Sequence, residues 1–148
     1  LAAGPLEGPN GARVAPRHVR PLGPLDEAGL ALWLARGPVF VSVARYEPFG
    51  LAVLEAALAG CALVLSDTPG FRELWDGAAI FVAERDDVAL ATVLHALLQD
   101  RERRAACGAA AEARARRYGV EAMTAGMLAV YRQVLHGAAQ GTMQGAAA

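Results

Sequence analysis

The chain has 148 residues, of which 55% are hydrophobic and 20% charged, a composition typical of one globular domain and not of a disordered chain. Its formal net charge is −1, which gives no electrostatic attraction to nucleic acid or to an anionic membrane surface. Two cysteines, Cys61 and Cys107, stand far apart without metal-ligand spacing, and we interpret them as reduced thiols of a cytosolic protein. The N-terminus has no charged-then-apolar signal segment.

The first quarter of the chain predicts two short strands and a helix. Residues 1–4 have the composition of a strand end, residues 6–17 are rich in Gly, Pro, Asn and Arg and predict a loop, and residues 18–23 predict a short strand. Asp26 is placed to cap a helix that ends at Gly37. The apolar positions expected on this helix are Leu30, Leu32 and Leu34.

A strongly apolar region follows. Residues 38–43 (PVFVSV) form a continuous β-branched and aromatic run, which predicts a strand covered on both faces. A helix is expected from about 49 to 59, stopped by Gly60, and residues 62–67 predict a second buried strand. The run from 48 to 65 is also long enough to span a bilayer, but its Pro, Glu and Gly residues favour a helix followed by a strand.

The second half of the chain predicts mainly helices. A short helix is expected over 71–77 and a strand over 79–84, after which Asp86 opens a long helical stretch with breaks. A last amphipathic helix is predicted from 120 to about 135, and residues 136–148 lack periodicity and predict a loose tail. The apolar face expected after Asp86 comprises Val88, Leu90, Val93, Leu94, Leu97 and Leu98, and that of the last helix Met123, Met127, Leu128, Val130, Tyr131 and Val134.

Strands that alternate with helices indicate an α/β fold, a Rossmann-like parallel sheet with flanking helices, in one domain over residues 1–135. In such sheets, ligands bind beyond the carboxyl ends of the strands. The strand over 38–43 leads through Ala44, Arg45 and Tyr46 to Glu47. Glu47 is therefore expected at the ligand-binding edge.

The residues after Glu47 have the features of an anion site. Pro48 suits the first turn of a helix, because its missing N–H is not needed there, and Gly50 lets a ligand approach the backbone. The unpaired N–H groups and the dipole of that turn favour an anion such as a diphosphate. Taken alone, Glu47 could equally cap the helix or lie on the surface.

Glu55 is the only charged residue between Glu47 and Asp67. A buried carboxylate without partners costs on the order of several kcal/mol. Glu55 is therefore expected either to point to solvent or to accept hydrogen bonds, and the two hydroxyls of a sugar diol would be suitable donors.

The segment EPFGLAVLE, from Glu47 to Glu55, resembles the E-x7-E motif of retaining nucleotide-sugar glycosyltransferases with two Rossmann-like domains, the GT-B architecture. The wider stretch from Val39 to Glu73 is similar to the donor-binding C-terminal domain of the group 1 glycosyltransferase family, including the G-x-x-x-V-x-S-D strand after the motif. A weaker resemblance extends over residues 1–133. It implies one half of a two-domain enzyme that binds a nucleotide-diphosphate sugar and transfers the glycosyl group with retained configuration to an acceptor.

The resemblance implies a role for each matched residue. Glu47 would be the catalytic residue, lying against the transferred sugar near its reacting carbon. The backbone of Phe49, Gly50 and Leu51 would donate to the sugar and the diphosphate, and Glu55 would hold the ribose hydroxyls. Contacts to the base would come from Gly23, Leu25 and Glu27. Such enzymes usually need no metal, so no metal or other cofactor is expected.

Departures from the family pattern concern the diphosphate and the acceptor. Val43-Ala44 replace a usual Pro-Ser, and Ala62 replaces a usual Pro. The chain has no lysine, and it lacks the Arg- and Lys-bearing loop and the acceptor-binding domain that come first in the family. We therefore expect a part of a longer enzyme, inactive when isolated, which self-associates through an exposed sheet edge or the last helix. By their sign, four arginines are candidates for the counter-charge of the diphosphate, although each is expected to be a solvated surface residue: Arg13, Arg17, Arg20 and Arg45.

Some alternatives stay open. A non-catalytic Rossmann-like module that binds a nucleotide or a protein partner is the alternative to a donor-binding domain. Asp67 and Glu73 could line the cleft, or could cap a helix and pair with Arg72. Trp33 and Trp75 are expected to anchor the core or an interface. The complete enzyme is expected in the cytoplasm, with peripheral attachment to a membrane as a further option.

Overall fold

The computed structural model describes residues 1–8 and 10–145. Its strands form two parallel sheets. In one, β1 (Ala2–Ala3) pairs with β2 (Pro21–Gly23), and in the other β3 (Val39–Ser42), β4 (Ala62–Ser66) and β5 (Ile80–Val82) pair in the order β3-β4-β5. Among the described residues, no strand pairing joins the two sheets.

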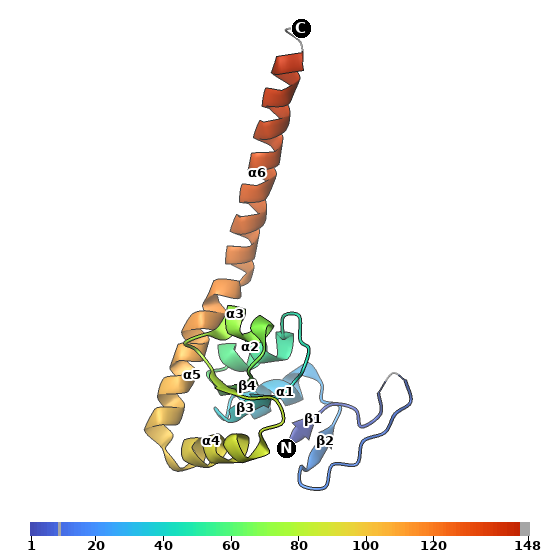
Figure 1. The fold of residues 1–148 in the computed structure, drawn as a ribbon, viewed down its shortest axis with the longest axis vertical. Helices are drawn as coiled ribbons and strands as arrows, with labels where there is room; N and C mark the ends of the chain where they lie inside the picture. Colours follow the sequence, from blue (N-terminus) through green and yellow to red (C-terminus); the bar gives the residue numbers. More distant parts are fainter. Residues whose placement is uncertain (9, 146–148) are drawn as a thin grey trace.

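Helices alternate with the strands of the larger sheet and then complete the chain (Figure 1). They are α1 (Glu27–Leu34), α2 (Leu51–Leu58), α3 (Pro69–Trp75), α4 (Asp87–Gln99), α5 (Arg101–Ala115), the 3-10 turn η1 (Arg116–Tyr118) and α6 (Val120–Gly145). α2 connects β3 to β4, and α3 connects β4 to β5, so parallel pairing of these strands is the expected outcome. The α/β, Rossmann-like fold with flanking helices is confirmed.

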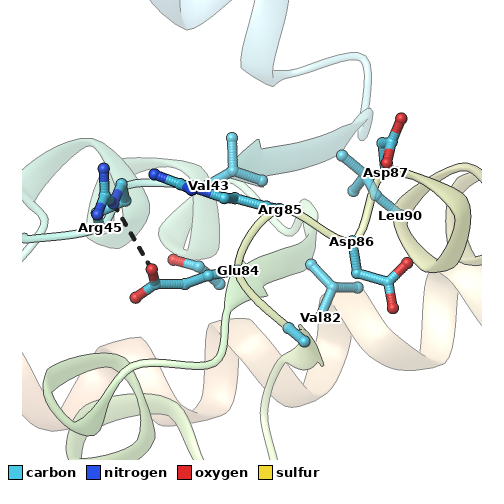
Figure 2. Close-up of a pocket in the computed structure, with 10 residues that line it drawn as sticks. Val43, Arg45, Val82, Glu84, Arg85, Asp86, Asp87 and Leu90 are labelled. Carbon is cyan, nitrogen blue, oxygen red and sulfur yellow. Dashed lines mark ion pairs between the residues drawn. The ribbon is translucent and has the colours of Figure 1, made fainter.

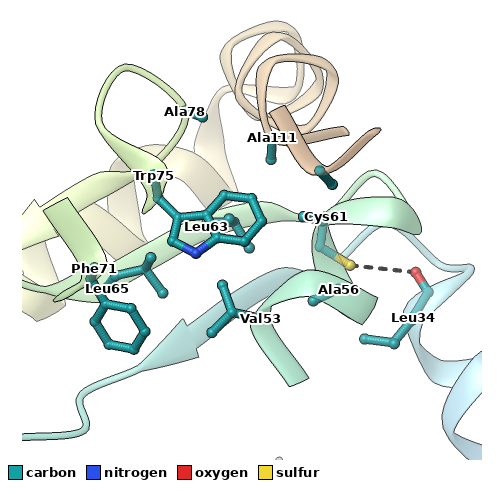
Figure 3. Packing of buried hydrophobic residues seen from close by; sticks show 12 residues of the cluster. Leu34, Val53, Ala56, Cys61, Leu63, Leu65, Phe71, Trp75, Ala78 and Ala111 are labelled. Atoms are coloured by element: carbon teal, nitrogen blue, oxygen red, sulfur yellow. Dashed lines mark hydrogen bonds between the residues drawn. The ribbon is translucent and has the colours of Figure 1, made fainter. Parts of the chain in front are cut away.

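The core lies on both faces of β4, whose five residues are all buried. Leu63 and Leu65 face the side covered by α2, α3 and α5, where they pack with Trp75 (Figure 3). Ala62 and Val64 face the opposite side, where they pack with Leu97 of α4 and its neighbours. Two apolar faces on one strand are what a strand between two helical layers requires.

Glycine allows α5 to approach this layer closely. A Cβ added at Gly108 would overlap the carbonyl oxygen of Gly60, so a larger residue at 108 would collide with backbone. Gly60 ends α2 with a φ of 75°, as the sequence predicts. The two cysteines are free: Cys107 is half-buried, and burial raises the pKa of the Cys61 thiol, whose Sγ lies 3.6 Å from the carbonyl oxygen of Leu34 (Figure 3).

The prediction that residues 38–43 form a strand is confirmed over Val39–Ser42, and the cover of this strand by helices is partial. Phe40 packs against one core cluster and Val39 against the other, whereas Val41 is 36% exposed. Among the described residues β3 pairs only with β4, so it is an edge strand. Some apolar helix positions were also expected inside and are exposed, because each helix covers the sheet over a narrow face only. These are Leu32 on α1 and Val88 and Leu98 on α4.

The last helix is longer than predicted. α6 continues past residue 135 to Gly145, so the expected loose tail is helical over 136–145, and residues 146–148 lie outside the described residues. Figure 1 shows α6 extending away from the α/β body, and the apolar face predicted for it is exposed. The apolar run from 48 to 65 divides into α2 and β4. None of the described helices is long and apolar enough to cross a membrane.

Candidate active site at the carboxyl edge of the sheet

The carboxyl ends of β3, β4 and β5 lie at one edge of the larger sheet, because the three strands are parallel. The loop after β3 carries Glu47 into α2, the loop after β4 carries Asp67 into α3, and the loop after β5 carries Glu84 towards α4. Glu47 lies in the loop after the carboxyl end of β3 and before a helix, as its sequence position predicts, and the binding of a ligand there stays a prediction.

Glu47 belongs to a tight turn that starts α2. Its Oε1 accepts a hydrogen bond from the N–H of Gly50 at 3.1 Å. Gly50 has a φ of 81°, is buried, and is the N-cap of α2, so the helix begins at Leu51. Pro48 therefore precedes the helix and is not in its first turn, which corrects the prediction. This turn fixes the Glu47 carboxylate through Oε1 and leaves Oε2 outside that bond.

Glycine is required at position 50 for space as well as for its φ angle. A Cβ there would lie 3.1 Å from Cγ2 of Val53 and 3.3 Å from Cε1 of Phe71. Phe71 is fully buried and lies in the first turn of α3. The turn that holds Glu47 is therefore packed against the next helix, and a side chain at position 50 would require Val53 and Phe71 to shift by a few tenths of an ångström.

Glu55 lies on the outer face of α2. The helix buries Val53, Ala56 and Ala57 against the core, and the Glu55 side chain is exposed. Two leucines on the same helix, Leu51 and Leu58, are also exposed, by 67% and 48%. No hydrogen bond to the Glu55 carboxylate is found within the described part of the chain. Of the two outcomes expected for Glu55, the structure therefore shows the exposed one.

Two further residues contact the loop around Glu47, and sequence reasoning missed both contacts. Ser66, the last residue of β4, donates its hydroxyl to the carbonyl oxygen of Ala44 at 2.5 Å. The ring of Phe49 meets the ring of Tyr118 edge-on, with centroids 5.7 Å apart. A polar residue at the end of a buried strand could have indicated Ser66. Tyr118 is far along the chain and gave no signal.

The three residues expected to contact a nucleotide base lie on the smaller sheet and just after it. Gly23 ends β2 with a φ of 73°, Leu25 is half-buried, and Glu27 is the first residue of α1, which is capped by Asp26. That these three residues contact a base stays a prediction. Within the described residues, strand pairing does not join this sheet to the one that carries Glu47.

Charged residues near the edge form two ion-paired groups. Arg72 forms two hydrogen bonds with the Asp67 carboxylate, at 2.7 and 2.9 Å, and the hydrogen bond with Arg72 lowers the pKa of Asp67. Arg72 also contacts Asp76 at 3.2 Å. Asp67 is thus engaged in pairing, the second of its two predicted roles. Arg45, predicted to be solvated, is exposed but lies 3.6 Å from Glu84.

A cavity of about 250 Å³ opens where β4 and β5 end, next to the Arg45–Glu84 pair (Figure 2). Apolar side chains from Val43, Val82 and Leu90 line it together with Arg45 and Arg85. Within residues 1–8 and 10–145, no three His, Cys, Asp or Glu side chains come together as metal ligands would. The expectation that the chemistry needs no metal stays a prediction.

Comparison with known proteins identifies relatives of this arrangement. A model of the family described as Glycosyl transferases group 1 matches residues 3–100. The D-inositol 3-phosphate glycosyltransferase of Xylanimonas cellulosilytica is 38% identical over 112 residues, which cover 74% of this chain and 27% of that protein.

Solved structures give the same answer for the fold. A sucrose-phosphate synthase from Thermosynechococcus elongatus superposes with a TM-score of 0.71 at 26% identity, over 80% of this chain and 30% of its own. Anabaena HepE, in complex with UDP and glucose, superposes with a TM-score of 0.66 at 22% identity, over 79% of this chain and 32% of its own. The chain thus spans 27% to 32% of the length of these proteins.

Proposed function

The chain belongs to the group 1 glycosyl transferases, and we propose that it is the part of such an enzyme that binds a nucleotide-diphosphate sugar for retaining transfer. In that reaction the bond between the anomeric carbon and the diphosphate breaks, the nucleoside diphosphate leaves, and a bond to an acceptor hydroxyl forms on the same face of the sugar. The acceptor hydroxyl loses its proton in the process. The acceptor-binding part would come from the remainder of a longer, two-domain protein.

One observation carries the proposal: the Gly50 N–H holds the Glu47 carboxylate at the carboxyl edge of the sheet, and no hydrogen bond to its second oxygen is found among the described residues. Its Oε1 is engaged by the Gly50 N–H, and Oε2 stays outside that bond. We propose that Oε2 lies against a sugar hydroxyl near the anomeric carbon, where positive charge develops as the diphosphate departs. A carboxylate that is fixed before the reaction needs no reorganisation during it.

The start of α2 supports diphosphate binding next to that position. No side-chain hydrogen bond caps α2 at Gly50, and within the described part of the chain no side chain accepts from the N–H groups of its first turn, including that of Leu51. Such a helix start favours an anion. The Phe49 and Leu51 N–H groups are the proposed donors, while Gly50 contributes by orienting Glu47.

Glu55 is proposed to accept from the two ribose hydroxyls. It is exposed on the outer face of α2, and a carboxylate can accept from two neighbouring hydroxyls at once. A base would lie towards Gly23, Leu25 and Glu27 in the complete protein. Neither transfer nor binding is proposed to need a metal. The complete enzyme is proposed to act in the cytoplasm, and attachment to a membrane surface would then have to come from elsewhere in the protein.

A non-catalytic nucleotide- or protein-binding module remains the second candidate. The observation that favours it is the state of two arginines near the edge: Arg45 contacts Glu84, and Arg72 contacts Asp67 and Asp76. Guanidinium groups that are already paired give a departing diphosphate less counter-charge. A transferase would therefore need additional cations from the rest of the protein.

Calorimetric titration of the chain with uridine diphosphate, and in parallel with guanosine and adenosine diphosphate, tests binding. Replacing Glu55 by Gln should weaken binding of the preferred nucleoside diphosphate by roughly tenfold to a hundredfold, since hydrogen bonds to a charged group contribute about 1.5–3 kcal/mol. Glu102→Gln, the same change at an exposed site on α5, should leave binding unchanged. No binding of any nucleoside diphosphate by the complete protein would reject the proposal, and binding without sugar transfer would favour the non-catalytic module.

A further inference from the structure

Three aromatic rings from distant parts of the chain pack together next to the Glu47 turn. Tyr118 of η1 lies in the middle: its ring centroid is 5.7 Å from that of Phe49, at 88°, and 6.0 Å from that of Trp75, at 54°. Both geometries fall in the range in which aromatic pairs attract each other beyond simple burial. Trp75 is almost fully buried, whereas Phe49 and Tyr118 are half-buried.

Tyr118 is itself fixed on the end of α3. Its hydroxyl donates to the carbonyl oxygen of Leu74 at 3.2 Å, and Arg114 donates to the same oxygen at 2.9 Å. Arg114 also donates to the carbonyl oxygen of Asp76 at 2.6 Å. These bonds satisfy carbonyls at the helix end, which have no partner within the helix. Tyr118 is therefore held in place, and the ring of Phe49 packs against its ring.

Phe49 connects this surface to the carboxylate at the sheet edge. The N–H of Gly50 that holds Glu47 belongs to the peptide unit that begins at the Phe49 carbonyl. Gly50 is buried, and the side chains of Val53 and Phe71 lie close to the position that a Cβ of residue 50 would take. A change in the position of the Phe49 ring would therefore turn the peptide that donates to Glu47.

We propose that Tyr118 is a positioning residue: through Phe49 it holds the Gly50 N–H against the Glu47 carboxylate. This inference rests on the proposed function, since it assigns Tyr118 a part in aiming the proposed catalytic group. It also gives α6 a connection to the site, because α6 begins at Val120, directly after Tyr118 and Gly119. If the start of α6 moved, the rings of Tyr118 and Phe49 and the peptide between Phe49 and Gly50 would transmit the movement to Glu47.

The test follows the Glu47–Gly50 bond itself by NMR on the isotope-labelled chain. The chemical shift of the Gly50 amide proton should change when the pH is lowered and the Glu47 carboxylate takes up a proton. Glu47→Gln should abolish that change. Tyr118→Leu, which removes the ring, should also abolish it, whereas Tyr118→Phe keeps the ring contact and should retain it. Tyr131→Leu, the same change at an exposed site on α6, is the matched control and should retain it as well.

Persistence of the Gly50 response in Tyr118→Leu would overturn the inference. If Tyr118→Leu does not fold, Phe49→Leu removes the other ring of the pair and is judged by the same criterion. A second readout uses the complete enzyme: Tyr118→Leu should lower kcat by on the order of tenfold to a hundredfold, with little change in the Kd of uridine diphosphate, and Tyr118→Phe should restore kcat. Failure of the complete protein to bind nucleotides would reject the proposed function alone, since the NMR result needs no ligand.

Discussion

The hydroxyl of Ser66 donates to the carbonyl oxygen of Ala44 at 2.5 Å, which ties the end of β4 to the loop that follows β3. Ser66 is a buried polar residue within an otherwise apolar strand, with 2% of its surface exposed. The loop leads from Ala44 through Arg45 and Tyr46 to Glu47. The hydrogen bond therefore fixes the upstream side of the turn that Phe49 and Tyr118 fix on the downstream side.

Replacing Ser66 by Ala is expected to lower the free energy of unfolding by about 1–3 kcal/mol, because it leaves the Ala44 carbonyl without its partner in a partly buried place. Urea denaturation of the chain measures this. Ser42→Ala is the matched control, since Ser42 ends β3 as Ser66 ends β4 and no side-chain hydrogen bond of Ser42 is found among the described residues. Equal effects of the two substitutions would contradict a specific role for the Ser66 hydroxyl.

Glu47→Gln should lower turnover, whereas Glu55→Gln should weaken nucleotide binding. The amide oxygen of the introduced glutamine can still accept from the Gly50 N–H, so the turn is expected to keep its shape while the charge is lost. In the complete enzyme, kcat should fall by on the order of a hundredfold or more, since the charge acts mainly in the transition state. Binding of the nucleoside diphosphate should hardly change. Loss of nucleotide binding in Glu47→Gln but not in Glu55→Gln would mean that the two roles are reversed.

Two helical glycines should respond oppositely to alanine. Gly108→Ala places a Cβ on top of the Gly60 carbonyl oxygen, so the backbone must move, at a cost of about 1–3 kcal/mol or more. Gly126 on α6 has open space around it, and Gly126→Ala should stabilise the helix by about 0.5–1 kcal/mol. Thermal and urea unfolding of both variants measure the difference. A neutral Gly108→Ala would show that α5 does not pack as described.

The Asp67–Arg72 pair predicts how stability depends on pH. The hydrogen bond with Arg72 lowers the pKa of Asp67 in the folded chain below its value in the unfolded chain, about 3.9. The contribution of the pair is therefore fully present above about pH 4 and is lost as the pH falls through the folded pKa. Asp67→Asn should be less stable than the parent at neutral pH, and this gap should close in acid. With Arg72→Gln in both proteins, no pH-dependent gap should remain.

The exposed edge of β3 and the exposed apolar face of α6 predict self-association of the chain. Val41 on β3 is 36% exposed, and Met127, Val130 and Val134 on α6 are 47% to 64% exposed. Unpaired strand edges and apolar helix faces both favour contact with another chain. Light scattering at rising concentration should detect dimers or larger species, and Val41→Lys or Val130→Lys should reduce them. A monodisperse monomer at high concentration would contradict this prediction.

The sequence alone determined the order and type of most elements. β4 was predictable because its apolar run is bounded by Gly60 and by Thr68-Pro69-Gly70, and it is buried on both faces. The caps at Asp26, Thr68 and Asp86 lie where local side-chain chemistry required them. The position of Glu47 at the carboxyl edge also follows from the strand that precedes it, since that rule depends on chain direction alone.

Only the tertiary structure decided what surrounds those residues. An apolar composition cannot show how completely helices will cover a strand, and so the exposure of Val41 on β3 was not expected. The contact of Glu47 with Gly50 could be anticipated locally, but Ser66 reaches the same turn from 22 residues beyond Ala44, and Tyr118 reaches it from the far end of α5. Such pairings arise because the packing of β4, α3 and η1 brings distant segments together, and no local pattern encodes that proximity.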